Sequence, residues 1–574
     1  MITCGVLFAV AIFLLSFTES APSNSEPRAL PGLERCVPST FRSVINRYGG
    51  ALAAGSPYTS DNEPYAQNLK VLVLAKDAGV SDICGIRVNL TANPNDGNDV
   101  SFEIYLPSPT KWNRRFLTVG NGGFNGGTSR LDMLTRSVHG WAVMSTNTGH
   151  EEQGMGWAVR GEEVQKDWAW RAMSRSLPFA KAVVAAYYGN VKTVANYYSG
   201  CSTGGRMGIR QIQEDPNSFD GMLIGAPAWN VKSAMPVLSR VGWLGEKFGL
   251  NPTFDPNLFV RISDRVYREC NVIGQDKSAD DGVVRDSAAC LEHFLQSGIR
   301  GPVWDGLDCT VDNPNCVSFS QREAFLTIAQ EFKRPPSNQS YAGDGFDITA
   351  PVDFSVFLLQ PNLMGFDQDF SRYMLGQELI WDNDTNGALL IDKSNAWDTR
   401  VRANADPSVL NGWKGKVILY TGTADGYVST EGTRRAFALA GGNDNPNLKF
   451  FELPGMPHCV DLGTGGKQPP WYIGGVANYL KSPTNSRWHM PNNTNPPLNT
   501  PEHDALNALT AWVEGQSRRP PTSAPTQFTS TAFANWPNLT ISKQRPICAS
   551  PLRQEWDGKG DVNRKESWSC VPSS

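Results

Sequence analysis

The residues with the clearest chemical potential lie in Gly200-Cys201-Ser202-Thr203-Gly204, a G-x-S-x-G pattern. The strand-forming run VANYYS precedes it, and the helix-forming stretch GRMGIRQIQE follows it. Between a strand and a helix, such a serine sits on a sharp turn with its hydroxyl exposed, and the flanking glycines relieve crowding. The pattern predicts Ser202 as the nucleophile of an acyl transfer and the amide of Thr203 as a donor to the developing oxyanion.

A second glycine-rich turn, Gly120-Asn-Gly122-Gly123-Phe124, follows the apolar run FLTV. Glycine lets the backbone approach a reacting carbonyl closely, so Gly122 or Gly123 is expected to supply the second oxyanion donor. Taken alone, the segment would be an ordinary turn. Its pairing with the Ser202 motif favours the functional interpretation.

A serine nucleophile needs a general base, and the chain contains only 6 histidines. In enzymes with this turn, the acid and then the histidine follow the serine along the chain. His458 follows the run LKFFEL in a loop, which is where a base must lie. The other downstream histidines fit worse: His293 falls in an interrupting segment, His489 in a polar loop, and His503 at a helix start, where a capping role is expected.

The acid is expected in the loop TGTADG, which follows the apolar run KVILY. Asp425 in this loop would accept the Nδ1 proton of His458 and orient the ring toward Ser202. Asp461 is a rival acid, although it lies only three residues from His458.

Cysteines stand directly beside two of these residues, because Cys201 precedes Ser202 and Cys459 follows His458. A disulfide between them would hold their Cα atoms about 5.5 Å apart and bring nucleophile and base together. The alternative is that both cysteines pair elsewhere.

Strand-like and helical runs alternate from about residue 98, which predicts an α/β sheet with parallel strands and covered faces. The alternation stops after Trp229 and resumes at KVILY. We therefore expect a signal peptide at 1–20, a first catalytic part at 21–230, an inserted lid at 231–408, and a second catalytic part at 409–574 that ends in a surface wrap.

The N-terminus and the cysteines predict secretion. The apolar run at 5–17 suits a signal peptide cleaved after Ser20 better than an uncleaved anchor. Ten cysteines then remain, without any CxxC pair, which favours five disulfides in an oxidising compartment. Five glycosylation sequons agree with this: Asn89, Asn338, Asn383, Asn492 and Asn538.

Charge and histidine spacing exclude other classes. The formal net charge of −4 disfavours binding to nucleic acid or to an anionic membrane. The histidines form no HExxH or HxH pattern, so zinc catalysis is not expected.

The motifs GCSTGG, FDGMLIGAPAW, GNGGF, TADG and His458-Cys459 resemble the fungal tannase and feruloyl esterase family, a lidded branch of the α/β-hydrolase fold. The resemblance runs from about Cys36 to about Cys570. It implies a serine carboxylesterase for aromatic acid esters, with Ser202, Asp425 and His458 as its triad. It also implies five disulfides: Cys201–Cys459, Cys270–Cys290, Cys309–Cys316, Cys36–Cys84 and Cys548–Cys570.

The same resemblance implies a structural calcium ion in the lid, in the segment QDKSADDGV between Cys270 and Cys290. This segment departs from the family pattern, and a solvated acidic turn is the alternative. The expected ligands are Asp276 and Asp281, with Asp280 as competitor, and the carbonyls of Ala279 and Val283.

The expected substrate is a small aromatic ester or a feruloylated oligosaccharide of the plant cell wall. A tannase acting on galloyl esters is the alternative. A secreted binding protein without catalysis is a more distant hypothesis.

Overall fold

The computed structural model describes most of the 574-residue chain. The described residues are 33–48, 83–91, 99–250, 255, 257–273, 283–330, 332–334, 339–343, 345–350, 368–379, 381–458, 471–472, 500–516, 526–528 and 541–572. The expected signal peptide at 1–20 therefore lies outside them. None of the helices in these ranges is long and apolar enough to cross a membrane.

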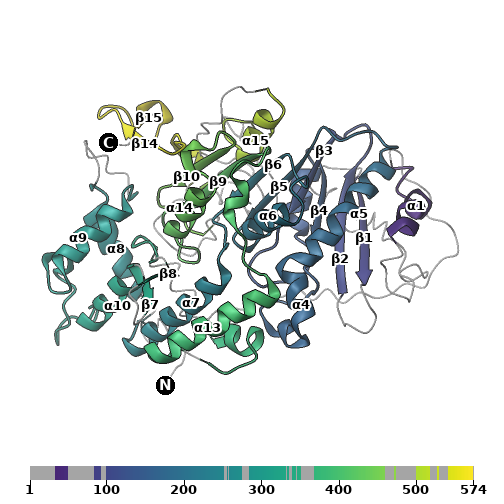
Figure 1. The fold of residues 1–574 in the computed structure, drawn as a ribbon. Coiled ribbons are helices and arrows are strands. Elements are labelled where there is room, and N and C mark those ends of the chain that lie inside the picture. The colour runs from purple at the N-terminus through teal and green to yellow at the C-terminus, as the bar shows by residue number, and fades with distance from the viewer. Residues whose placement is uncertain are drawn as a thin grey trace, which may run out of the picture.

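A mixed sheet of eight strands forms the centre of the molecule, in the order β1-β2-β4-β3-β5-β6-β9-β10 (Figure 1). Every neighbouring pair from β4 to β10 is parallel. The strands are β1 (Ile83–Thr91), β2 (Asp99–Pro107), β3 (Arg115–Val119), β4 (Ala142–Thr146), β5 (Ala195–Cys201), β6 (Gly221–Gly225), β9 (Lys416–Gly422) and β10 (Leu448–Leu453).

The first two strands correct the expected parallel sheet, because β1 pairs antiparallel with β2 and β2 pairs antiparallel with β4. The link between β1 and β2, at 92–98, is shorter than the dozen or so residues that a parallel crossover needs. A hairpin is therefore the pairing that the chain length permits.

Helices cover both faces of the sheet and bury two separate apolar clusters against it. One face is covered by α1 (Pro38–Tyr48), α5 (Ala172–Tyr187), α6 (Thr203–Glu214) and α14 (Thr430–Leu439). The other face is covered by α3 (Arg130–Ser137) and α15 (Ala505–Val513). All five residues of β4 and of β6 are buried, as expected for parallel strands between two helical layers. The molecule thus has the α/β-hydrolase fold.

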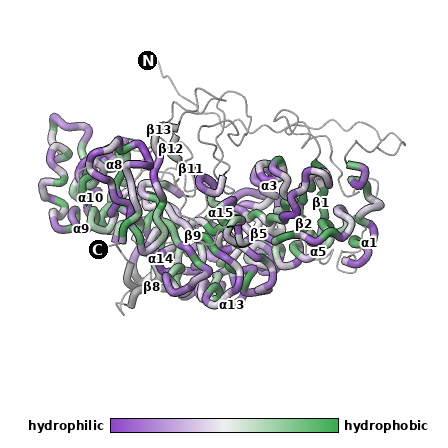
Figure 2. The backbone as a smooth tube through the Cα atoms, turned by 90° about the horizontal axis from the view of Figure 1, so that it is seen from above, coloured by the Kyte–Doolittle hydropathy of each residue, from purple (hydrophilic) through white to green (hydrophobic). Residues whose placement is uncertain are grey.

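Between β6 and β9 the chain leaves the sheet and forms a mainly helical unit. Its elements are α7 (Val231–Lys247), α8 (Leu258–Cys270), α9 (Ser287–Ser297), η4 (Pro302–Trp304), α10 (Phe319–Ala329), β7 (Phe332–Arg334), β8 (Gln339–Gly343), η5 (Phe370–Met374) and α13 (Asp384–Val401). Helices α8, α9 and α10 lie on the side of the molecule away from β1 and β2 in both Figure 1 and Figure 2. Figure 2 also shows hydrophilic and hydrophobic colours mixed along α13.

The remaining elements are short. Before α5 lie η2 (Gly156–Arg160), α4 (Glu162–Lys166) and the π-helical turn η3 (Asp167–Arg171). After the helical unit come η6 (Pro407–Leu410), η7 (Gly442–Asp444), β11 (Trp471–Tyr472), β12 (Thr526–Phe528), β13 (Ile541–Gln544), β14 (Leu552–Trp556), η8 (Lys565–Ser567) and β15 (Trp568–Pro572).

The C-terminal hairpin of β14 and β15 is tied by the Cys548–Cys570 disulfide. Just before it, Ser550 N–H donates to Phe450 O at 2.8 Å, and Ala549 bridges to Phe451. Strand β10 is an edge strand, so this contact covers backbone groups that would otherwise be open. The C-terminal segment is thus a surface wrap around the edge of the sheet.

Candidate active site

Ser202 lies in the turn between β5 and α6, and its backbone angles are φ 61° and ψ −127°. Positive φ is unfavourable for residues with a Cβ, so the surrounding contacts must impose it. Ser202 N–H donates to Gly225 O, and Ala228 N–H donates to Ser202 O, both at 3.0 Å. These bonds tie the turn to the end of β6 and to the segment after it, and the turn stands between a strand and a helix as the sequence motif predicts.

Two glycines of the motif are required by close backbone contacts. A Cβ at Gly200 would lie 2.7 Å from the carbonyl carbon and oxygen of Gly204. A Cβ at Gly204 would lie 2.9 Å from Asn121 O, in the glycine-rich loop after β3. Since real Cβ atoms do not approach so closely, glycine is what allows the serine turn and the glycine-rich loop to meet.

The glycine-rich loop begins where β3 ends, and Gly120 N–H donates to Ser199 O at 3.0 Å. Of the two predicted donors, Gly123 lines the same cavity as Ser202, whereas Gly122 is exposed. Thr203 also lines this cavity, and its amide belongs to the first turn of α6, where N–H groups have no partner within the helix. The amides of Thr203 and Gly123 are therefore the better placed of the three candidates.

His458 and Asp425 form a direct pair, with 2.7 Å between His458 Nδ1 and Asp425 Oδ2. Asp425 is fully buried, and its other carboxylate oxygen accepts from the amides of Tyr427 and Val428 at 2.8 Å each. With Nδ1–H donating to Asp425, the imidazole presents Nε2 as a proton acceptor. The rival acid, Asp461, lies outside the described residues.

The loops after β9 and β10 hold this pair together. Ala424 N–H donates to Met456 O at 2.9 Å, and Gly455 N–H donates to Thr423 Oγ1 at 2.8 Å. The ring of Tyr427 stacks on the imidazole of His458, with 5.0 Å between centroids and 25° between planes. Tyr427 also lines the cavity that contains Ser202, so the acid–base pair borders on the cavity of the predicted nucleophile.

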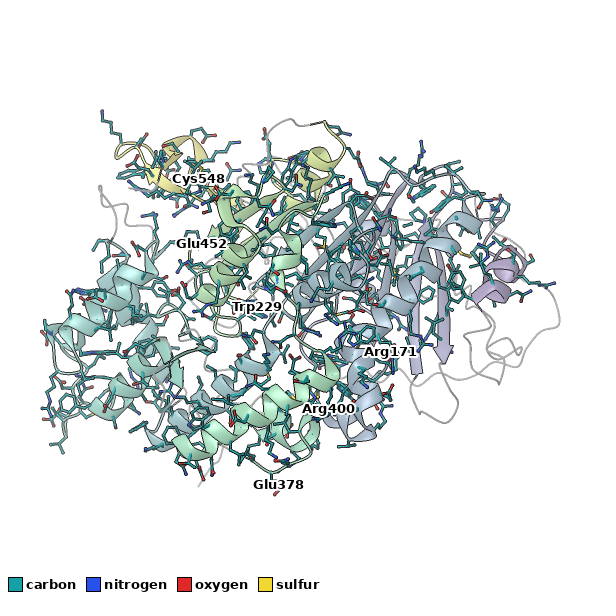
Figure 3. The ribbon with its side chains drawn as sticks, in the orientation of Figure 1. Arg171, Trp229, Glu378, Arg400, Glu452 and Cys548 are labelled. Carbon is teal, nitrogen blue, oxygen red and sulfur yellow. A yellow bond between two sulfur atoms is a disulfide. The ribbon has the colours of Figure 1, made fainter. Side chains whose placement is uncertain are left out.

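The cavity lies between the sheet and the helical unit, and no residue with a charged side chain is among its described lining. Figure 3 shows one of its lining residues, Trp229, at this junction. The aromatic residues of the lining are Phe124, Trp168, Trp229, Phe346 and Tyr427. An apolar aromatic surface beside a serine hydroxyl suits an uncharged aromatic acyl group.

Motif reasoning did not find most of these cavity residues. Phe124 and Trp229 stand in quoted motifs, GNGGF and FDGMLIGAPAW, but the motifs predict no cavity role for either residue. Trp168 comes from η3 and Phe346 from the helical unit, and no local pattern relates two segments so far apart in the chain.

Of the downstream histidines His489 and His503, only His503 belongs to the described residues. His503 does not cap α15, contrary to the expectation. The cap is Asp504, whose carboxylate accepts from Asn507 N–H at 2.9 Å. His503 is buried, and its Nδ1 lies 2.9 Å from Thr500 Oγ1. His489 lies outside the described residues.

The described part of the structure contains four of the five expected disulfides: Cys36–Cys84, Cys270–Cys290, Cys309–Cys316 and Cys548–Cys570. Cys201 is also disulfide-bonded, with a partner outside the described residues. Because Cys459 lies outside them as well, its pairing with Cys201 stays a prediction.

The expected calcium ligands fall almost entirely outside the described part of the chain, which includes only Val283, a fully buried residue. No cluster of three or more metal-ligating side chains occurs among the residues that are described. Calcium therefore stays a prediction. Of the sequons, Asn89 and Asn383 are described, and both are exposed. The other three, Asn338, Asn492 and Asn538, lie outside.

Comparison with known proteins agrees with this fold. The chain belongs to the tannase and feruloyl esterase family, whose sequence model matches residues 84–350 and 390–571. It is therefore a carboxylic ester hydrolase of that family.

Curated relatives extend over most of the chain. It is 26% identical to a probable feruloyl esterase B-2 of Aspergillus terreus over 512 residues, which cover 86% of each chain. It is 24% identical to feruloyl esterase B of Aspergillus niger, over 95% of this chain and 98% of the relative.

Solved structures share the fold. A crystal structure of feruloyl esterase B from Aspergillus oryzae superposes with a TM-score of 0.69 at 23% identity, covering 85% of this chain and 90% of the other. Tannin acyl hydrolase from Aspergillus niger gives a TM-score of 0.62 at 19% identity, with 86% of both chains covered.

Proposed function

We propose that this esterase hydrolyses hydroxycinnamoyl esters, above all feruloyl esters of plant cell-wall polysaccharide, through an acyl-enzyme on Ser202. The observation that carries the proposal is the uncharged, aromatic lining of the cavity beside Ser202. A feruloyl group is planar and uncharged, so its transfer from water into such a cavity is favourable.

In the first step, Ser202 Oγ attacks the ester carbonyl while Nε2 of His458 takes the hydroxyl proton. The negative charge of the tetrahedral intermediate is stabilised by the amides of Thr203 and Gly123. His458 then returns the proton to the leaving alkoxide, and the acyl group remains on Ser202. Throughout this step the Asp425 carboxylate stabilises the imidazolium that forms on His458.

In the second step, a water molecule loses a proton to His458 and attacks the acyl-enzyme carbonyl. Collapse of the second tetrahedral intermediate breaks the bond to Ser202 Oγ, which regains its proton from His458. The aromatic acid is released, and the free enzyme is restored.

Two polar side chains of the cavity already form hydrogen bonds within the protein, and this favours a feruloyl group over a galloyl group. Asn230 accepts a hydrogen bond from Asn404 at 2.7 Å, and Ser429 donates to Gly345 O at 2.8 Å. A galloyl ring carries three hydroxyl groups, and each loses hydrogen bonds to water on burial unless the site replaces them. A feruloyl ring has one hydroxyl and one methoxyl group, so it loses fewer hydrogen bonds to water on burial.

The test of substrate class compares kcat/KM for methyl ferulate and methyl gallate. We expect the ferulate ester to be preferred by at least about tenfold, since one unreplaced buried hydrogen bond costs roughly 1–3 kcal/mol. A preference for the gallate ester would contradict the proposal and favour the tannase alternative.

The test of the nucleophile is Ser202→Ala. We expect activity to fall to the background rate, with loss of fluorophosphonate labelling and an unchanged melting temperature. Ser202→Gly should be equally inactive but more stable than Ser202→Ala by about 1 kcal/mol, because glycine tolerates positive φ. Retained activity in either variant would exclude Ser202.

We also infer that the protein is secreted, since disulfides persist in oxidising compartments and the described chain contains four complete pairs. Its appearance in the medium of an expressing fungus tests this. Glycosidase treatment then tests the sequons, and unfolding with and without a calcium chelator tests the expected ion.

A further inference from the structure

A stack of three side chains borders the cavity at the nucleophile. The guanidinium carbon of Arg206 lies 4.4 Å from the centroid of the Trp168 ring. The Trp168 ring stacks on Phe124, with 4.7 Å between centroids and 16° between planes. Trp168 and Phe124 line the cavity together with Ser202, and Phe124 follows Gly123 in the loop between β3 and α3.

Arg206 is unusual because it is completely buried on helix α6, four residues after Ser202. One of its guanidinium nitrogens donates to Ala169 O and Ala403 O, at 2.7 Å each. Its Nε and its other terminal nitrogen are buried without a hydrogen bond among the described residues. Burial lowers the pKa of Arg206 to about 9, so it remains a cation at neutral pH.

Burying a cation whose hydrogen bonds go to backbone carbonyls rather than to a carboxylate is unfavourable compared with burying an apolar side chain of similar size. The contacts of Arg206 with three separate segments of the chain indicate its structural role. Its main-chain N–H donates to Ser202 O at 3.0 Å, Ala169 follows Trp168 in the π-helical turn, and Ala403 lies where the chain returns from the helical unit. Arg206 thus joins the nucleophile turn, the cavity wall and the end of the insertion.

We propose that Arg206 is a positioning residue for the acyl pocket: it holds Trp168, and through it Phe124, against the aromatic acyl group bound at Ser202. This inference rests on the proposed function, because it assigns a selective role to the same cavity. A planar guanidinium can stack flat on an indole while its edge donates to carbonyls, whereas a lysine ammonium has no plane to stack.

The experiment compares Arg206→Met with the wild-type enzyme on methyl ferulate and on p-nitrophenyl acetate. Methionine fills a similar volume but neither bonds to carbonyls nor attracts the indole face. We expect kcat/KM for methyl ferulate to fall roughly 10- to 100-fold, mainly through KM, because the wall is displaced from the ring. The acetyl group is too small to reach the wall, so its kcat/KM should change by less than about threefold.

Arg210→Met is the matched control. Arg210 is also buried on α6, lies over the ring of Trp170 at 5.9 Å, and bonds to Glu214. Trp170 is not among the described cavity-lining residues. This variant should keep the wild-type ratio between the two substrates even if its stability falls.

A double variant tests whether Arg206 acts through Trp168. Trp168→Phe alone should reduce selectivity for methyl ferulate, and Arg206→Met in that background should reduce it little further. If the loss in the double variant equalled the product of the two single losses, positioning through Trp168 would be contradicted. If Arg206→Met does not fold, Arg206→Lys replaces it in the same comparison, with a smaller expected loss.

Equal losses on both esters, or no loss on either, would overturn the role of Arg206. A wild-type enzyme that cleaves acetyl but not aromatic esters would instead contradict the proposed function. The role of Arg206 would then be judged on the largest acyl group that the wild-type enzyme cleaves.

Discussion

Asp425 is held by three hydrogen bonds, and each constrains how the carboxylate can be replaced. One oxygen accepts from two backbone amides and the other faces His458 Nδ1. In Asp425→Asn, the side-chain NH2 must face either these amides or the Nδ1 proton. We expect kcat to fall about 10³- to 10⁴-fold with little change in KM, because the imidazole loses its orientation and its counter-charge.

Steady-state kinetics on methyl ferulate check this prediction. Asp406→Asn is the control, because Asp406 also accepts a backbone amide but lies on the surface at η6. A loss of less than tenfold in Asp425→Asn would show that another carboxylate, such as Asp461, serves His458.

His150 should make the folded protein sensitive to acid. It is buried, its ring stacks on Trp157 at 4.1 Å, and Nδ1 lies 3.2 Å from Glu152 O. Burial lowers its pKa to about 4; Glu152 partly opposes this shift, and Arg160 adds to it. Relative to an unfolded value near 6.5, this corresponds to about 3 kcal/mol of stability at neutral pH.

Acid lowers the stability because the unfolded chain binds a proton more readily than the folded protein. Above pH 6.5 the stabilisation is complete, and between about pH 6.5 and 4 the unfolded chain takes up a proton that the folded protein excludes, so stability falls. In His150→Asn, the free energy of unfolding by urea should depend less steeply on pH in this window, even if its absolute value falls. His293→Asn, at a side chain that is 43% exposed, is the control. An unchanged slope in His150→Asn would contradict the prediction.

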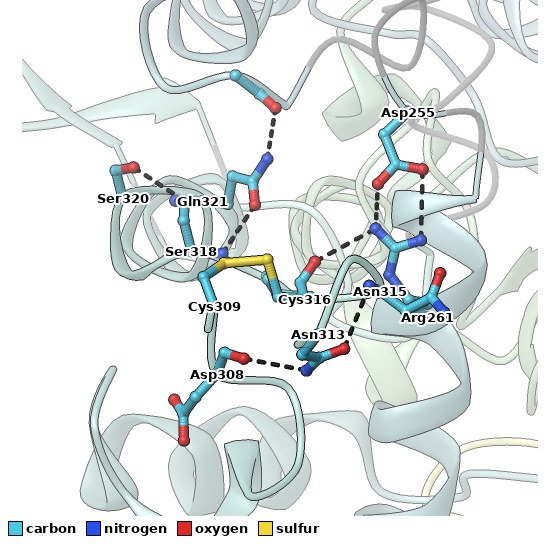
Figure 4. Close-up of a disulfide and its surroundings, with 12 residues drawn as sticks. Asp255, Arg261, Asp308, Cys309, Asn313, Asn315, Cys316, Ser318, Ser320 and Gln321 are labelled. Atoms are coloured by element: carbon cyan, nitrogen blue, oxygen red, sulfur yellow. Dashed lines mark hydrogen bonds and ion pairs between the residues drawn. A yellow bond between two sulfur atoms is a disulfide. The ribbon is translucent and has the colours of Figure 1, made fainter. Parts of the chain in front are cut away.

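At the scale of elements, α10 begins with a capping box beside the Cys309–Cys316 disulfide (Figure 4). Ser318 Oγ accepts from Gln321 N–H at 3.2 Å, and Gln321 Oε1 accepts from Ser318 N–H at 2.8 Å. The side-chain Nε2 of Gln321 also donates to Gly249 O, which lies after the end of α7. This cap therefore fixes α10 against a helix whose residues line the cavity.

We expect Ser318→Ala to destabilise α10 by about 1 kcal/mol, because one of the first amides of the helix loses its acceptor. Hydrogen exchange of the first-turn amides should accelerate roughly fivefold if local opening governs exchange. Ser320→Ala, on the same turn, leaves both capping bonds intact and should not change the exchange rate. Equal exchange in both variants would contradict the role of the cap.

Sequence reasoning succeeded where a local pattern reflects a local cause. The run KVILY became β9, LKFFEL became β10, and the stretch after Ser202 became α6, because buried strands and amphipathic helices carry their burial pattern in neighbouring residues. It failed for β1, whose pairing depends on β2, and for the cavity wall, because Trp168 and Phe346 meet only through tertiary packing. Asp425 and His458 could be proposed because each follows an apolar strand.

At the scale of the whole molecule, one apolar cluster crosses the boundary between the insertion and the sheet-bearing part. It joins residues of α7, α8, α10 and α13 to Phe124, Trp157 and Trp168. Within it, the Trp397 indole N–H donates to Gln165 Oε1 at 2.8 Å, and both side chains are buried. Ion pairs also cross the boundary, between Arg400 and Glu162 at 3.0 Å and between Arg402 and Glu214 at 2.8 Å.

Because the insertion shares its core with the catalytic part, the two should unfold together. Trp397→Ala removes a side chain that is 1% exposed, and we expect it to destabilise the whole enzyme by about 3–5 kcal/mol. Loss of ester hydrolysis and loss of circular dichroism should shift to the same lower temperature. Leu389→Ala, at an exposed position on the same helix, should shift neither. If the helical signal melted before activity was lost, the insertion would be an independent folding unit, and its core would not stabilise the cavity.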